Sequence, residues 1–154
     1  MNKTLINKAE FGLIDGARRI VNSHVDNRFC SINFGSIGSI GSFGLSWKSD
    51  LIEPTILFLS NQIWIGIDQR LVCLSQETGC IVVSLVLMSN FSFFLSSKSI
   101  FIAICESDIL MFNESLSLME IINTPHIISN ACVEKEMLIV NTLEGQTLSI
   151  STGR

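Results

Sequence analysis

The sequence predicts an all-β protein built from antiparallel meanders. Short runs alternate isoleucine with other residues, and a strand places every second side chain on the same face. The runs recur at offsets of 36 to 38 residues between positions 56 and 151, and a period in this range is typical of stacked supersecondary units. We therefore expect one all-β domain over residues 1–154, in which residues 56–151 hold three repeats and residues 1–50 are irregular.

The first repeat has three apolar runs, at residues 58–60, 63–67 and 71–75. In the middle run isoleucine occupies every second position, so a strand would direct all three isoleucines to one face. The intervening positions, among them Trp64, are also largely apolar. Because both faces are apolar and β-branched residues dominate, we expect strands that are covered on both sides.

The second repeat has the same runs at residues 94–96, 100–104 and 109–113, and the third has them at residues 137–140 and 147–151. Turn-forming residues separate the runs, as a meander requires. These turns are expected at Asp68-Gln69, Glu77-Thr78-Gly79, Glu106-Ser107, Asn113-Glu114-Ser115, Glu134-Lys135-Glu136 and Glu144-Gly145.

The stretch IWIGIDQRLVCLSQETGCIVV, residues 63–83, resembles the strand–turn–strand–TG–strand run of β-propeller blades of the WD or quinoprotein kind. The resemblance covers residues 56–151, but the Trp-Asp dipeptide and the Gly-His of such blades are absent. A closed propeller has at least four blades, and only residues 29–47 could form an irregular fourth. The resemblance therefore implies blade-like repeats that form an open curved sheet, a sandwich or a partial propeller.

Residues 3–21 fit two local structures. Their apolar residues follow helical spacing, but Gly12 and Gly16 each destabilise a helix by about 1 kcal/mol relative to alanine. The alternative is a β-hairpin that turns at Asp15-Gly16. We favour the hairpin, because the rest of the chain is predicted to be β.

A loop rich in glycine, serine and isoleucine is predicted over residues 35–44, between strands at residues 29–34 and 44–48. It is not a phosphate-binding loop, because no Gly-Lys-Ser/Thr follows the glycines. The large apolar residues of the loop would either pack into the core or contact a partner, and we favour packing, because exposed apolar loops promote aggregation. These residues are Ile37, Ile40 and Phe43.

Charge is unevenly distributed along the chain. Residues 1–50 carry six basic and four acidic residues, a formal charge of +2, whereas residues 51–154 carry four basic and ten acidic residues, a formal charge of −6. The acidic residues fall mainly at predicted turns, which would give one edge of the sheet a negative potential. Such an edge disfavours nucleic acid and favours a basic protein as the partner, although acidic turns are also common on ordinary solvated surfaces.

The composition also bears on the compartment. Residues 78–97 are twenty residues without charge, long enough to cross a bilayer, but six serine and asparagine residues interrupt them, so we expect no membrane association. The N-terminus has no apolar signal-peptide run. The five cysteines form no C-x-x-C motif, which favours free thiols and a cytoplasmic location.

The sequence offers little for catalysis. No G-x-S-x-G motif is present, and the two histidines, His24 and His126, have no neighbouring pattern of metal ligands or nucleophiles. We therefore expect no enzyme activity, no metal and no cofactor.

In general character the chain is similar to bacterial immunity proteins, which neutralise a basic nuclease toxin, as in contact-dependent inhibition. This resemblance implies that acidic turn residues cover the cationic active site of a toxin such as a ribonuclease, while apolar residues fill the centre of the contact. The alternative is a structural or adaptor β module that packs on a larger protein. The predicted partner-binding residues are Glu106, Asp108, Glu134, Glu136 and Glu144.

Overall fold

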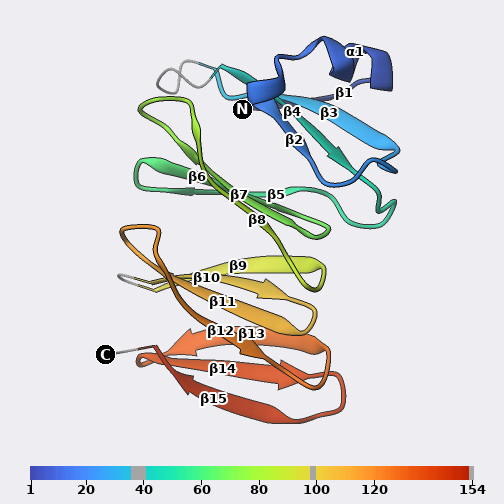
Figure 1. Cartoon of the computed structure of the whole chain (residues 1–154). Coiled ribbons are helices and arrows are strands. Elements are labelled where there is room, and N and C mark those ends of the chain that lie inside the picture. The colour runs from blue at the N-terminus through green and yellow to red at the C-terminus, as the bar shows by residue number, and fades with distance from the viewer. Residues whose placement is uncertain (36–40, 98–99, 153–154) are drawn as a thin grey trace. The chain divides into compact units, whose positions relative to one another are not determined.

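The computed structural model describes residues 1–35, 41–97 and 100–152. In this part of the chain fifteen strands form four open sheets, with two short helices near the N-terminus (Figure 1). The all-β prediction is therefore confirmed. The chain divides into two compact units, unit 1 (Met1–Val86) and unit 2 (Leu87–Arg154), and each is described by itself; the expectation of a single domain stays a prediction.

The first sheet of unit 1 has the strand order β1-β3-β4-β2. Strand β2 runs parallel to β4, and the other neighbours are antiparallel. The elements are β1 (Asn2–Leu5), α1 (Lys8–Leu13), the 3-10 helix η1 (Gly16–Arg18), β2 (Arg19–Val21), β3 (Arg28–Asn33) and β4 (Ser42–Trp47).

The predicted hairpin at Asp15-Gly16 is wrong, because helix α1 and η1 occupy this segment and β1 does not pair with β2. A capping box starts α1: the Asn7 side chain accepts from the Glu10 backbone N–H at 2.9 Å, and the Glu10 carboxylate accepts from the Asn7 N–H at 2.8 Å. The Asp15 carboxylate then caps η1. Local side-chain bonds therefore outweigh the two glycines.

The helix lies close to β4 at Gly44. A Cβ atom at Gly44 would stand 2.7 Å from Ile14 Cδ1 and 2.8 Å from Phe11 Cε2, so only glycine permits this approach. Phe11 is buried and also contacts Phe29 of β3, with ring centroids 5.2 Å apart. The helix thus covers part of the first sheet.

The predicted loop at residues 35–44 is too long, because β4 begins at Ser42. Positive φ angles at Gly35 and Gly41 mark where the chain leaves β3 and approaches β4. Phe43 is fully buried, which confirms packing for this residue. Ile37 and Ile40 lie outside the described residues.

The second sheet of unit 1 is the regular meander that the first repeat predicts. Its alternating isoleucines, with Val72 and Leu74, join Leu45 and Trp47 of the first sheet in one buried core. Trp64 is buried on the other face. The strands are β5 (Thr55–Leu59), β6 (Gln62–Ile67), β7 (Arg70–Ser75) and β8 (Ile81–Val86), in this order.

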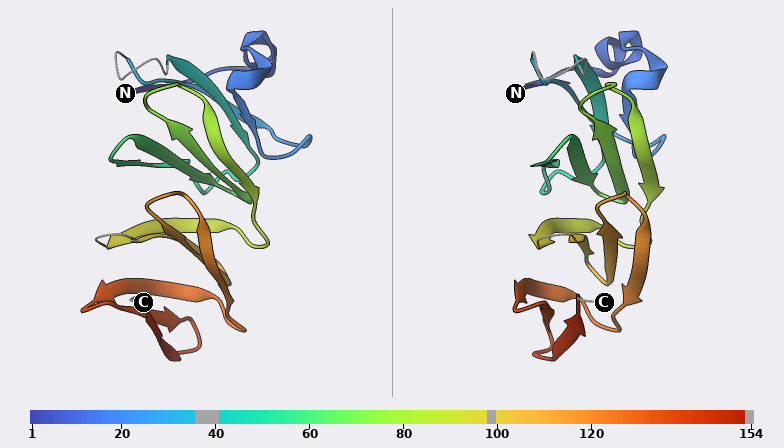
Figure 2. Two further views of the ribbon diagram at one scale, coloured as in Figure 1. Left: turned by 60° about the vertical axis from the view of Figure 1, so that its left-hand side comes forward. Right: turned by 90° about the vertical axis from the view of Figure 1, so that its left-hand side faces the viewer.

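Unit 2 contains two further meanders, one for each remaining repeat. Figure 2 shows that the strands of each sheet lie side by side with a marked twist. One core joins the two sheets: it includes Ile102 and Met111 of the first and Leu138 and Val140 of the second. The sheets are β9 (Phe91–Ser97), β10 (Ile100–Cys105), β11 (Asp108–Asn113) and β12 (Leu118–Asn123), then β13 (Ile128–Glu134), β14 (Met137–Thr142) and β15 (Thr147–Ser151).

All five cysteines are free thiols. Cys30, Cys73 and Cys105 are buried, and loss of hydration raises their pKa from 9.0 to about 11, 12 and 12 respectively. Cys80 is exposed. No helix formed by the described residues is long and apolar enough to cross a bilayer.

Candidate functional site

The five predicted acidic residues do not share one edge of unit 2. Glu134 ends β13 and Glu136 lies in the β13–β14 turn, which precedes β14, whereas Glu144 lies in the turn that follows β14. A six-residue strand separates the two positions by about 20 Å. Glu106 and Asp108, at the β10–β11 turn, belong with Glu144, because both turns are bonded to the loop at residues 124–128.

Asp108 holds the fold together and is not available at the surface. It is 6% exposed, and its Oδ2 accepts from Ser89 Oγ at 2.6 Å. The same Ser89 oxygen accepts from the Ser107 backbone N–H at 3.1 Å. The prediction that Asp108 contacts a partner therefore conflicts with its burial, because a carboxylate bonded inside a turn is costly to expose.

A surface patch surrounds the other two residues. We call it the acidic loop patch, and it consists of Glu106, His126, Ile127, Leu143 and Glu144. The Ile128 N–H donates to the Glu106 carbonyl at 2.7 Å, and the Leu143 N–H donates to the Ile127 carbonyl at 2.9 Å. His126 Nδ1 lies 3.5 Å from Glu144 Oε2. These bonds fix three loops of unit 2 against one another.

The centre of the patch is apolar and exposed. Ile127 is 48% exposed and Leu143 is 65% exposed, and the bond between their backbones holds the two residues side by side. The Glu144 side chain is also largely exposed, whereas Glu106 is half-buried and accepts from Asn90 Nδ2 at 3.1 Å. Apolar residues beside carboxylates are suited to a protein contact with a basic rim.

Sequence reasoning did not identify Ile127 and Leu143. The available signal was a large apolar residue beside a predicted turn, immediately before the Glu144-Gly145 pair in one case and after Pro125-His126 in the other. An apolar residue at a turn is often exposed. The end of the β13–β14 ladder, where Ile128 pairs with Thr142, and the adjacent backbone bond bring these residues together.

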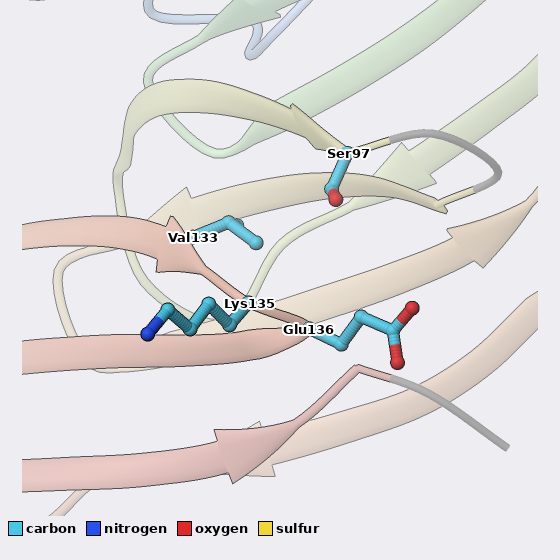
Figure 3. Close-up of a pocket in the computed structure, with 4 residues that line it drawn as sticks. All are labelled: Ser97, Val133, Lys135 and Glu136. Carbon is cyan, nitrogen blue, oxygen red and sulfur yellow. The ribbon is translucent and has the colours of Figure 1, made fainter.

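The opposite end of unit 2 has a cavity of about 360 Å³. Figure 3 shows its lining residues Ser97, Val133, Lys135 and Glu136, with the side chains of Lys135 and Glu136 pointing in opposite directions. Both residues have positive φ angles, 47° and 67°, as a type I′ turn requires. The positive charge of Lys135 partly offsets the negative charges of Glu134 and Glu136, so this end of unit 2 is less negative than the acidic loop patch.

Over the described ranges, no three histidine, cysteine, aspartate or glutamate residues are grouped so that they could hold a metal ion. His24 is exposed in unit 1, whereas the His126 ring lies beside the Glu144 carboxylate and the His126 backbone carbonyl accepts from the Thr124 hydroxyl. The expectation of no enzyme activity and no cofactor stays a prediction.

The sheet of β13–β15 has three strands among the described residues, whereas each of the other repeats has four. The Thr142 N–H donates to the Gln146 carbonyl and the Thr152 N–H donates to the Glu136 carbonyl. The backbone N–H and C=O groups of successive residues point to opposite sides of a strand. Those of Leu148 and Ile150 therefore point toward β14, and those of Thr147 and Ser149 point away from it. We call the side of β15 that carries the backbone groups of Thr147 and Ser149 the β15 edge.

Comparisons with known proteins bear on the fold alone. No family model and no curated protein sequence matches the chain. The computationally designed Ika4 protein is similar in structure, with a TM-score of 0.55 and 14% sequence identity, over 91% of this chain and 100% of the designed one. The β-propeller protein BamB from Moraxella catarrhalis matches with a TM-score of 0.50 and 13% identity, over 70% of this chain and 33% of BamB. The match to BamB supports a weak structural resemblance to a β-propeller protein.

Proposed function

We propose that this protein is a non-catalytic binding protein that recognises a basic protein through the acidic loop patch. One observation carries the proposal: two exposed apolar residues, Ile127 and Leu143, are held together by a backbone bond, and each has a neighbour in the sequence that belongs to the His126–Glu144 contact. Contacts with this arrangement concentrate binding energy at a central apolar cluster, and the charges at the rim accelerate association.

The charge of unit 2 supports a basic partner. Residues 87–154 contain seven acidic and three basic residues, a formal charge of −4, whereas residues 1–86 contain seven of each. A negative surface attracts a positively charged partner over about 10 Å at moderate salt. In its finer form the proposal is a cytoplasmic immunity protein that covers the active site of a basic nuclease toxin.

A pull-down from the host lysate with matched variants tests this proposal. Wild-type protein should retain a basic partner that salt releases, and the double variant I127A/L143A should lose it. The control is L118A/I121A, which removes two exposed apolar residues of similar size from β12 of the same unit. Equal retention by both double variants would remove the acidic loop patch from the contact, and a nuclease assay of the partner with and without the protein tests the finer form.

A structural or adaptor module is the second candidate, favoured by the β15 edge. An extended segment of a larger protein could pair with Thr147 and Ser149 as a fourth strand. In the other repeats the fourth strand adds Ile81 or Ile122 to the core. The substitution Ser149→Pro removes an outward N–H and blocks strand addition, whereas Ser149→Ala keeps it; loss of a salt-resistant partner with only the proline variant would favour the adaptor function.

A further inference from the structure

A second cavity lies in unit 1, where the edge strand β2 meets β7 and β8. Its volume is about 180 Å³. The lining includes Arg19 and Ile20 of β2, Arg70 and Val72 of β7, and Ile81 and Ser84 of β8. Among the residues that the structure describes, its lining contains no acidic residue, although unit 1 as a whole has seven. The cavity is therefore a positively charged space with apolar walls.

The strand register explains why these side chains meet. Val72 pairs with Ser84 across β7 and β8, so both side chains lie on one face of the sheet, and Arg70 lies on that face because it is two residues from Val72. Val72 and Ile20 belong to the buried core between the two sheets of unit 1. The cavity therefore lies at the edge of this core, beside β2, the edge strand of the first sheet. Here the side chains of Arg19, Arg70 and Ser84 line the space together with apolar residues.

The two arginines are unusual in having no anionic partner. Within residues 1–35, 41–97 and 100–152, neither Arg19 nor Arg70 forms a salt bridge, whereas Arg28 of the same unit contacts Asp50 and Glu53. The Nε atom of Arg70 is buried and has no hydrogen-bond partner in this part of the chain. A buried charged donor without an acceptor is costly, so this site would gain more than a solvated arginine from an anion.

We propose that this cavity binds the carboxylate of a small acid with a short apolar chain. A guanidinium offers two parallel N–H groups that match a carboxylate, and the Ser84 hydroxyl can donate a further bond. The apolar lining from Ile20, Val72 and Ile81 suits an alkyl chain and not a fully hydrated anion such as inorganic phosphate. A volume below the usual ~300–1,000 Å³ of drug-sized sites restricts the chain to a few carbons.

Titration calorimetry of the full chain with isovalerate tests the proposal. Acetate, which lacks the alkyl chain, and inorganic phosphate should each bind at least about tenfold more weakly than isovalerate. The bound carboxylate could belong to a peptide C-terminus or to a free acid. A short peptide that ends in leucine with a free carboxylate, compared with the same peptide as its C-terminal amide, distinguishes these two sources. Tighter binding of the free peptide than of isovalerate assigns the site to a C-terminus; the reverse assigns it to a free acid.

Variants locate the binding. Arg70→Met and Arg19→Gln should each weaken isovalerate binding at least about tenfold, whereas the control Lys8→Gln, which removes an exposed charge from α1 of the same unit, should leave it unchanged. Fluorescence of the buried Trp47 and Trp64 shows whether unit 1 remains folded. Arg70→Met should also raise the urea midpoint without ligand, since it removes the unpaired donor. Absence of isovalerate binding to the wild type, or equal affinity in Arg70→Met and Lys8→Gln, would overturn the proposal.

Discussion

Two hairpin turns, one in each unit, use their acidic residues differently. In unit 1 the buried Asp68 accepts from the backbone N–H groups of Lys48 at 2.7 Å and Ser49 at 3.3 Å, and from Asn22 Nδ2 at 3.4 Å. In unit 2 the exposed Glu144 lies 3.5 Å from the half-buried His126 and, among the described residues, accepts no backbone N–H. The two residues occupy comparable hairpin turns, yet one is part of the fold and the other faces solvent. An acidic turn therefore indicates a partner only where its carboxylate has no backbone donors.

The largest effect is expected from Asp68→Ala. This change leaves the N–H groups of Lys48 and Ser49 without their acceptor, in a turn that ties the two sheets of unit 1 together. Hydrogen bonds to a charged group contribute about 1.5–3 kcal/mol each, so we expect a loss of about 3 kcal/mol. Urea unfolding followed by tryptophan fluorescence measures it, because Trp47 and Trp64 are both in unit 1. A loss below about 1 kcal/mol would remove the contrast with Glu144.

The second-largest effect is expected from alkaline pH, which should destabilise unit 1. Burial raises the pKa of Cys30 from 9.0 to about 11 and that of Cys73 from 9.0 to about 12. The folded state disfavours both thiolates. The two neutral thiols therefore contribute fully to the free energy of unfolding below pH 9, and this contribution is lost as the pH rises from 9 through the pKa values of the folded state. Between pH 9 and pH 10 the loss should be about 2 kcal/mol for the two thiols together.

The control for this pH effect is the variant Cys73→Ala. The substitution itself lowers stability, but the slope of unfolding free energy against pH should fall by about half, since one of two titrating groups is gone. The measurement is the same fluorescence-detected urea unfolding at pH 8, 9 and 10. An unchanged slope would show that other groups dominate the alkaline response.

A smaller effect, this time a gain in stability, is expected from changes at the β13–β14 turn of unit 2. Lys135 and Glu136 both hold positive φ angles, a conformation that asparagine and glycine adopt more readily. The double change K135N/E136G should therefore stabilise unit 2 by about 1 kcal/mol. Thermal unfolding followed by circular dichroism detects this, because unit 2 has no tryptophan. The matched change S115N/L116G, at a different turn, should not help equally, since of those two only Leu116 has a positive φ.

The smallest effect on folding is expected from Glu144→Gln. Surface ion pairs contribute about 0–1 kcal/mol, and the His126–Glu144 contact is 3.5 Å long and partly exposed. We expect a change in unfolding free energy below about 0.5 kcal/mol. Circular dichroism against urea checks this value. A loss above about 2 kcal/mol would place Glu144 with Asp68, as a residue of the fold.

The repeats could be predicted from the sequence because they rest on local alternation. The runs at residues 63–67, 100–104 and 137–140 all fall within strands, and the predicted turns separate them. Helix α1 was also locally encoded, by Asn7 and Glu10, but the glycines obscured this signal. The parallel pairing of β2 with β4 could not be predicted, because it joins strands that are distant in the sequence.

The candidate site was only partly predictable for a similar reason. Acidic residues at turns are visible in the sequence, but their burial depends on partners elsewhere, such as Ser89 for Asp108. The pairing of Ile127 with Leu143 depends on the register of β13 and β14, which shifts at the irregularity between Ile128 and Asn130. The charge imbalance between the two parts of the chain was visible from composition, whereas the apolar centre of the patch required the fold.

The most direct test of the contrast between the Asp68 and Glu144 turns is the rate at which the captured partner associates with the protein at about 50 mM and about 500 mM salt. For the wild type we predict association at least about tenfold slower at high salt. The variant Glu144→Gln should associate more slowly at low salt and lose part of this dependence, whereas Glu77→Gln, at an exposed turn of unit 1, should behave as wild type. Association that is insensitive to salt and to Glu144→Gln would contradict the assignment of the acidic loop patch.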